Sequence, residues 1–235
     1  MNNTLSFAVR GRYALFTDPF SKTGGDKCSY PVPTYEALKG IMKSVFWKPT
    51  IIWRVLRVRV LNPIRMESKS VKPLIMDKGG NTLAYYSYLV DPAYQVEVRF
   101  EWNLNRPEFE ADRIDGKFYT ISRRMIEKGG RRDVFLGTRE CQGYVEPCVF
   151  GEGPGHYDNA GTRDDFGIMF HGFDYPDETG RDEFRSRFWK PVMKDGVIEF
   201  IAPEECTMSR LIRKMKAAPL KSSGLGEESL QYELD

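Results

Sequence analysis

Apolar and polar residues alternate in three stretches of the chain, and this pattern predicts three half-buried strands. The clearest lies at residues 94–102, where large apolar side chains occupy every second position. Residues 4–12 repeat the pattern, and residues 51–61 are rich in β-branched side chains. Because side chains of a strand point alternately to its two faces, each stretch should place one face against a core.

Two other segments show helical spacing. Thr34 is a suitable N-cap, and apolar residues follow it at intervals of three and four. This helix should end near Trp47, because Pro49 restricts the residue before it. A second helix is predicted from about residue 117 to 128, with the following glycine pair as its C-terminal cap.

The order of these elements predicts an α+β fold with a ferredoxin-like βαββαβ core, whose last strand falls in the apolar run at 134–145. We expect a ferredoxin-like domain with an internal insertion over residues 1–148 and a small β-rich C-terminal region over 149–213. A hairpin should turn at residues 194–196, and residues 214–235 should form a loosely ordered tail. Many unrelated functions use this fold, so function must come from particular residues.

The charge distribution changes this picture. The net charge is only +2, but residues 1–75 hold 13 Lys/Arg against 4 Asp/Glu, whereas the remaining residues hold 22 against 29. Such asymmetry favours one basic face and a polyanionic partner. The alternative is that these basic residues only solvate exposed strands.

Several classes of chemistry lack a sequence signature. The four cysteines (28, 141, 148 and 206) contain no CxxC pair, which argues against a zinc site. There is no Walker loop and no Ser/His/Asp spacing, so we expect neither a metal nor another cofactor. We find no secretory signal pattern and no apolar run near 18 residues, so we expect a cytoplasmic protein with reduced thiols and no membrane association.

Residues 129–141 combine glycines, which let backbone amides approach a ligand, with arginines, whose forks match phosphate geometry. The arginines are Arg131, Arg132 and Arg139. We therefore predict that this segment binds a phosphate backbone. For Arg139 the alternative is a salt bridge to Asp133 or Glu140.

Further candidates for RNA contact are basic or aromatic. The basic residues are Lys39, Lys43, Arg57 and Arg59. Their alternative role is to form a solvated helix or strand face. Phe46, Trp47 and Phe118 could stack on bases, although Trp47 could equally pack in the core.

Six segments of the chain also carry family motifs. They are residues 13–19, 29–34, 37–41, 47–50, 129–145 and 172–180. Together they resemble the CRISPR-associated fifth-subunit family of subtype I-C, which consists of RAMP-type proteins, over about residues 5–205. The run from Gly129 to Cys141 is the most specific of these motifs.

The resemblance implies a concrete function. Members of the family bind the repeat hairpin of precursor CRISPR RNA, cut at its 3′ base without a metal and keep the resulting 5′ handle. They belong to the interference complex (Cascade), beside the backbone and large subunits. The expected partners are therefore CRISPR RNA, those subunits and, within the complex, target DNA.

The resemblance also exposes a departure from the family at the cleavage site. Attack by the RNA 2′-hydroxyl needs a base, an acid and a cation. Members that cut typically have a tyrosine before Trp-Lys-Pro and a Lys-His pair after a glycine, and here these positions are Phe46, Lys117 and Phe118. Lys117 can stabilise negative charge, but a phenyl ring transfers no proton. Two hypotheses remain open: a metal-independent endoribonuclease and a catalytically inactive RNA-binding scaffold.

Other side chains could replace the missing groups. His156 lies in a glycine-rich loop that could carry it into the site. Tyr119 is adjacent to Phe118, but one step along a helix turns a side chain by about 100°. His171 lies in an apolar strand pattern and is better explained as a structural histidine.

Overall fold

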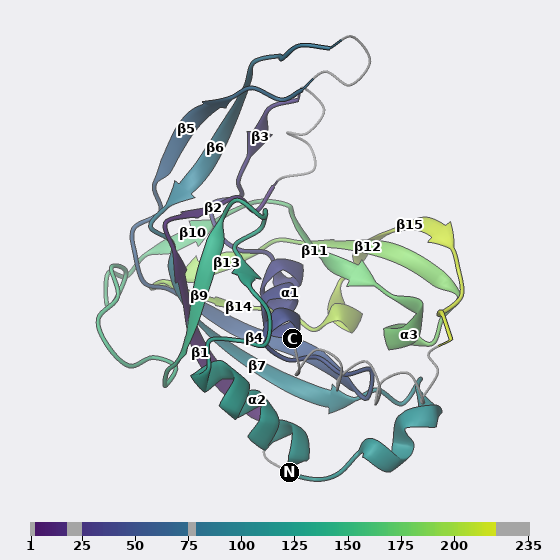
Figure 1. The fold of residues 1–235 in the computed structure, drawn as a ribbon. Helices are drawn as coiled ribbons and strands as arrows, with labels where there is room; N and C mark the ends of the chain where they lie inside the picture. Colours follow the sequence, from purple (N-terminus) through teal and green to yellow (C-terminus); the bar gives the residue numbers. More distant parts are fainter. Residues whose placement is uncertain (1–2, 18–24, 75–78, 220–235) are drawn as a thin grey trace, which may run out of the picture.

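A computed structural model describes residues 3–17, 25–74 and 79–219 (Figure 1). Its largest sheet has eight strands in the order β10-β13-β14-β4-β7-β1-β9-β8. These strands are β1 (Thr4–Gly11), β4 (Ile51–Val60), β7 (Ala93–Trp102), β8 (Val134–Phe135), β9 (Gln142–Pro147), β10 (Arg163–Asp165), β13 (Val192–Lys194) and β14 (Val197–Glu199). The predicted strands at 4–12, 51–61 and 94–102 are all present in this sheet.

The centre of the sheet is ferredoxin-like. Along the chain, β1, α1 (Tyr35–Val45), β4, β7, α2 (Lys117–Glu127) and β9 follow one another, and in space the strands lie in the order β4-β7-β1-β9. Each neighbouring pair is antiparallel. Helix α1 packs on β4, and α2 packs on β1 and β9. The predicted α+β class and βαββαβ order are therefore confirmed.

The start of α1 and the end of α2 each have a local cause in the sequence. The Thr34 hydroxyl accepts a hydrogen bond of 3.2 Å from the Ala37 amide, which caps α1. At the end of α2 the chain enters Gly129 with a φ of 81°, and the Gly130 amide donates to the Met125 carbonyl at 2.8 Å. The predicted glycine cap is thus present, and it starts the loop that carries Arg131.

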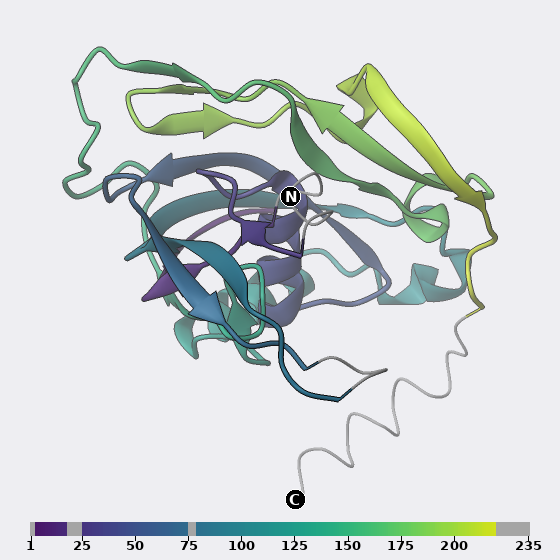
Figure 2. The ribbon, with the colours of Figure 1, turned by 90° about the horizontal axis from the view of Figure 1, so that it is seen from above.

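The C-terminal region contributes to two sheets. Its β13–β14 hairpin turns at Asp195 and Gly196, both with positive φ, as the sequence predicted. Strand β14 then pairs with β4, so the central sheet continues across the boundary predicted at residue 148. The other strands, β11 (Met169–Asp174), β12 (Glu183–Trp189) and β15 (Met208–Lys214), form a three-stranded sheet of their own, seen at the upper right of Figure 2, and β11 contacts α1.

Shorter elements complete the fold. They are α3 (Pro176–Thr179) and the 3₁₀ helices η2 (Pro107–Asp112) and η3 (Pro203–Glu205). The C-terminal tail was predicted to be loosely ordered over 214–235; β15 ends at Lys214, and residues 220–235 lie outside the described residues. No helix in the described part of the chain is long and apolar enough to cross a membrane.

The insertion between β4 and β7 forms part of a separate sheet. Strand β6 (Ala84–Val90) is its centre and pairs with β2 (Tyr13–Ala14), β3 (Lys27–Cys28) and β5 (Met66–Val71). Figure 1 shows this sheet standing away from the main one. The sequence predicted the insertion but not its pairing with the segment before α1.

Candidate nucleic-acid interface

The loop after α2 is fixed to the end of α1 through its backbone. The Arg131 amide donates to the Val45 carbonyl at 3.1 Å, and the Arg132 amide donates to the Ser44 carbonyl at 3.2 Å. These carbonyls lie in the last turn of α1, where a helix leaves acceptors unsatisfied. The loop therefore has a defined backbone, and both arginine side chains are left exposed at the surface.

Arg131 and Arg132 line an open groove of about 640 Å³. Residues 128–134 form one side of it, and residues 142–145 of β9 form the other. Within the described residues neither guanidinium group makes an ion pair, although Asp133 also lines the groove. Two uncompensated cations in a groove are suited to an anionic ligand.

Arg139 occupies the turn between β8 and β9, outside this groove. The turn depends on Gly137, whose φ is 98° and where a Cβ would stand 2.0 Å from the Leu15 carbonyl oxygen. Arg139 is exposed, and the predicted alternative, a salt bridge to Asp133 or Glu140, is not formed among the described residues. It therefore remains a candidate contact on a neighbouring surface.

Tyr144 also lines the groove but was not among the predicted contacts. Its side chain lies on β9 and is 61% exposed, whereas Gly143 and Val145 on either side of it are buried. An exposed ring beside two free arginines is a suitable platform for a base. The alternation around Tyr144 was the sequence signal for its exposure.

The three positions that the resemblance aligned with the cleavage site come together in space. The rings of Phe46 and Phe118 lie 5.9 Å apart between centroids, and the Lys117 ammonium group lies 5.7 Å from the Phe118 centroid. Phe46 follows the last residue of α1, and Lys117 is the first residue of α2. The ends of the two helices thus meet at one place.

Burial defines what the two phenylalanines can do. Phe118 is 1% exposed and Phe46 is 4% exposed. Phe118 also contacts Trp102 and Phe100, with ring centroids 5.7 and 6.5 Å away. The suggestion that these two rings stack on bases does not fit their place in the core. Trp47 is about one-third exposed, so both of its predicted roles remain possible.

Lys117 lies at the edge of this cluster and is partly exposed. Its ammonium group forms an ion pair with Asp112, whose other carboxylate oxygen accepts a 3.0 Å hydrogen bond from the Thr50 hydroxyl. Thr50 is buried at the start of β4, so the network attaches Lys117 to the sheet. The site therefore holds one cation, paired with Asp112, but no acid or base at the two positions beside it.

Lys39 and Lys43 both bind Glu178 of α3. Lys39 is 2% exposed and pairs with Glu178, and the Lys43 ammonium lies 2.9 Å from the same carboxylate. Burial lowers the pKa of Lys39 despite this partner. Burial alone would raise the pKa of Glu178, but the two lysines hold it below its usual value. The prediction that Lys39 contacts RNA is therefore withdrawn, because its charge is buried and neutralised; Lys43 is also committed to this pair.

Arg57 and Arg59 also form ion pairs within the protein. Arg57 makes two hydrogen bonds to Glu97, at 2.8 and 3.2 Å. Arg59 is 95% buried and binds Asp158 at 2.6 Å. This hydrogen bond lowers the pKa of Asp158. The register shift after Val55 breaks the predicted alternation, and Arg59 anchors the glycine-rich loop instead of facing RNA.

His156 lies at the far end of β4 from Phe46. Its amide donates to the Leu61 carbonyl at 2.8 Å, whereas the Phe46 carbonyl accepts from Trp53 near the start of the strand. A ten-residue strand spans roughly 30 Å, so His156 is not beside Lys117. The suggestion that His156 replaces the missing catalyst does not fit this position.

The other two proposed substitutes are also placed elsewhere. Tyr119 lines a separate groove with Thr4 and Cys148. His171 is fully buried, stacks on Tyr35 at 4.3 Å between centroids and donates to the Ile201 carbonyl. Burial lowers its pKa to about 3. This is the structural role that the sequence suggested for His171.

Within the described residues there is no group of three or more His, Cys, Asp or Glu side chains placed to hold a metal ion. No disulfide bond joins any of the four cysteines within the described residues. Burial raises the pKa of Cys148 to about 11, so this thiol is a poor nucleophile and a poor metal ligand at neutral pH.

The fold and the groove together define a RAMP-type α+β protein, and comparison with known proteins gives the family. Residues 4–201 match the model of the protein family Cas_Cas5d, which is described as CRISPR-associated protein (Cas_Cas5). The chain therefore belongs to this family, which confirms the CRISPR-associated family of the predicted resemblance.

Two curated relatives carry the same name, CRISPR pre-crRNA endoribonuclease Cas5d. The one from Thermus thermophilus is 28% identical over 188 residues, which cover 76% of this chain and 77% of the relative. The one from Mannheimia succiniciproducens is 41% identical over 68 residues, 29% of each chain.

Two solved structures are similar over almost their whole length. A CRISPR-associated protein has a TM-score of 0.70 and 38% identity, and the match covers 88% of this chain and 96% of that one. A functionally uncharacterized protein from Streptococcus mutans has a TM-score of 0.69, 37% identity and the same coverage. Both support the fold described above.

Proposed function

We propose that this protein binds the repeat hairpin and 5′ handle of CRISPR RNA as a subunit of a subtype I-C interference complex. The observation that carries the proposal is the groove beside α2, where Arg131 and Arg132 face solvent without an ion pair among the described residues. The loop backbone is held by α1, so the two guanidinium groups are presented from a fixed base. Such groups recognise phosphate through paired hydrogen bonds.

Family membership makes precursor CRISPR RNA the best candidate for the polyanion that this groove binds. The curated relatives are named pre-crRNA endoribonucleases. The glycine–arginine segment at 129–141 is the most specific part of the resemblance to that family. Arg139 and the exposed ring of Tyr144 extend the contact surface beyond the two groove arginines. Lys117 would then face a phosphate at the junction of the two helices.

The chemistry at that junction favours binding without efficient cutting. Cleavage by the 2′-hydroxyl needs proton transfer, and Phe46 and Phe118 supply none. Each acid or base usually contributes roughly 10²–10⁴-fold to such a reaction. Lys117 could still stabilise the charge that develops on the phosphate. We therefore propose a scaffold function in which cleavage at this site is slow or lost.

The second candidate is a metal-independent endoribonuclease. The names of the curated relatives and the preserved Lys117 favour it. In both cases the protein would act in the cytoplasm with the backbone and large subunits of the complex and meet target DNA only within that assembly. The two candidates differ in one observable, namely whether the bound repeat is cut.

The binding proposal is tested by measuring the affinity for repeat RNA of the protein and of its Arg131→Ala, Arg132→Ala variant. Each lost charge-assisted contact should weaken binding by roughly tenfold. Arg123→Ala is the matched control, because Arg123 is an exposed arginine of α2 that already pairs with Glu127. Equal affinities of all three proteins would contradict the proposal.

A further inference from the structure

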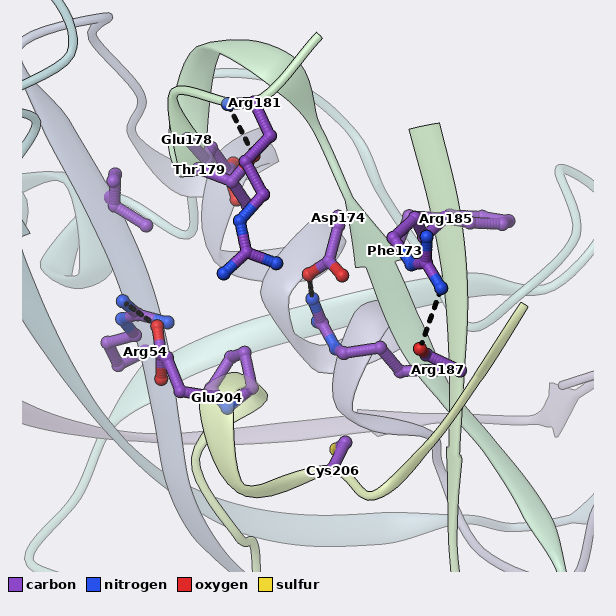
Figure 3. A pocket seen from close by; sticks show the side chains of 13 residues that line it. Arg54, Phe173, Asp174, Glu178, Thr179, Arg181, Arg185, Arg187, Glu204 and Cys206 are labelled. Atoms are coloured by element: carbon purple, nitrogen blue, oxygen red, sulfur yellow. Dashed lines mark hydrogen bonds and ion pairs between the residues drawn. The ribbon is translucent and has the colours of Figure 1, made fainter. Parts of the chain in front are cut away.

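A second cavity, which shares no lining residue with the groove, is rich in arginine (Figure 3). It has a volume of about 290 Å³ and lies between β4, α3, η3 and the three-stranded sheet. Its arginines are Arg54, Arg181, Arg185 and Arg187. It includes part of the 172–180 motif, for which the RNA-binding proposal gives no role.

Two of these arginines are neutralised within the protein. Arg54 binds Glu204 at 2.7 Å, and Arg185 binds Glu183 at 3.0 Å. Glu178, which also lines the cavity, is already taken by Lys39 and Lys43. Two arginines of the cavity remain. Arg187 pairs with one acid, Asp174, and no acid of the cavity pairs with Arg181 among the described residues.

Arg187 is incompletely satisfied. Its Nη1 binds Asp174, but its Nε and Nη2 have no oxygen or nitrogen acceptor among the described residues, although the side chain is 96% buried. These two atoms form one edge of the guanidinium, the edge that grips an oxyanion with two parallel bonds. A buried donor without an acceptor is costly, so this edge indicates a missing partner. The neighbouring Cys206 thiol is only a weak acceptor.

Arg181 supplies the second cation. It is exposed, lines the same cavity and makes no ion pair within the described residues. Gly180 ends α3 with a φ of 71°, and this left-handed turn directs the chain so that Arg181 reaches over the cavity toward Asp174 and Arg187 (Figure 3).

The backbone beneath Arg187 is shaped to receive its guanidinium. At Gly172 a Cβ would lie 3.0 Å from Arg187 Nη2 and 2.6 Å from a carboxylate oxygen of Glu36. A side chain at position 172 would therefore displace the guanidinium. This close packing fixes Arg187 in advance of binding, which reduces the entropy lost when a ligand arrives.

We propose that this cavity binds one phosphate group, held by the Nε–Nη2 edge of Arg187 and by Arg181. The Ser209 hydroxyl on β15 lines the same space and can contribute a further hydrogen bond. Because the Arg187 edge is buried, the Cys206 side chain beside it must shift on binding. The phosphate belongs either to the backbone of the bound RNA or to a free phosphate compound. The first of these two sources rests on the proposed function.

The test is calorimetric titration of the full chain with inorganic phosphate at constant ionic strength. Saturable binding is expected, and Arg181→Ala should weaken it by roughly tenfold. Arg187→Lys keeps the charge but loses the two-bonded edge and should have a similar effect. Arg123→Ala should bind phosphate as the unmodified protein does. Arg181 is exposed, so its variant decides the question even if Arg187→Lys does not fold.

The source of the phosphate group follows from a second titration in the presence of saturating repeat RNA. Loss of phosphate binding would assign the cavity to an RNA phosphate, and unchanged binding would assign it to a free compound. The Arg131→Ala, Arg132→Ala variant should still bind phosphate, which separates this site from the groove. Absence of binding up to about 20 mM, or equal binding by the Arg181→Ala protein, would overturn the proposal.

Discussion

The rings of Phe46 and Phe118 are in contact range, 5.9 Å apart between centroids, although 72 positions separate them in the sequence. Phe46 follows α1, Phe118 is the second residue of α2, and both are buried in the core. Lys117 lies beside them on the solvent side. The positions that would carry the acid and the base are therefore adjacent in space, but they are filled with apolar rings.

Replacing this pair should introduce cleavage. Phe46→Tyr combined with Phe118→His supplies groups that can transfer protons next to Lys117, and the rate of repeat cutting should rise by about 10²-fold or more. The melting temperature should fall, because the imidazole nitrogens would be buried among Phe100 and Trp102. Single-turnover cleavage of labelled repeat RNA measures the gain.

The matched control for that experiment is Phe46→Tyr combined with Phe118→Leu, which alters the packing without adding an imidazole. Because it lacks the imidazole, this protein should cut more slowly than the Phe46→Tyr, Phe118→His protein. If both double variants have the same rate, the helix junction is not the cleavage site.

Salt dependence should report the phosphate contacts of the groove. For Arg131→Ala with Arg132→Ala, the slope of log K against log salt should become less negative by roughly 1.4–1.8, since each phosphate contact contributes about 0.7–0.9. Fluorescence anisotropy between about 50 and 200 mM salt measures the slope. An unchanged slope would mean that neither side chain touches a phosphate.

Tyr144 should contribute by stacking and not by charge. Tyr144→Ala should weaken binding of repeat RNA by about 5–150-fold, because stacking on a ring contributes roughly 1–3 kcal/mol per base. Tyr144→Phe keeps the ring and should retain most of the affinity. The salt slope should stay constant in both variants. Equal losses in the two variants would show that the hydroxyl, and not the ring, is what matters.

His171 should make the free energy of unfolding depend on pH. Its pKa is about 3 in the folded protein and 6.5 in an ordinary setting, so between these values only the unfolded chain binds the proton. Stability should therefore be greatest above pH 6.5 and fall with acidification, by about 2 kcal/mol at pH 5. Urea unfolding at pH 7 and pH 5 should show this loss in the native protein and a smaller one in His171→Phe. A loss of the same size in the variant would show that His171 is not the group responsible.

The central fold was predictable from the sequence because its signals are local. Alternation over residues 94–102, the Thr34 cap and the glycine pair after α2 each specify an element without any tertiary information. The groove arginines were predictable for the same reason, since they lie within one short segment. Tyr144 was not named, because the alternation along β9 separates two faces of the strand without showing which of them meets the core.

The failures concern side chains whose partners are distant in sequence. Lys39 meets Glu178 across 139 positions, and Arg59 meets Asp158 across 99. A basic residue on a predicted surface cannot be distinguished from one half of a buried ion pair until the fold brings its partner near. His156 was a plausible catalyst only while the location of its loop at the far end of β4 was unknown.

The most direct measurement is a denaturing-gel cleavage assay of the unmodified protein with its repeat RNA in EDTA, performed at a protein concentration that saturates binding. We expect the RNA to be bound and to remain uncut over hours, because the helix junction has a cation but no acid or base. Rapid cutting in EDTA at the 3′ base of the hairpin would contradict the scaffold function. It would mean that a residue at some position other than 46 and 118 transfers the protons.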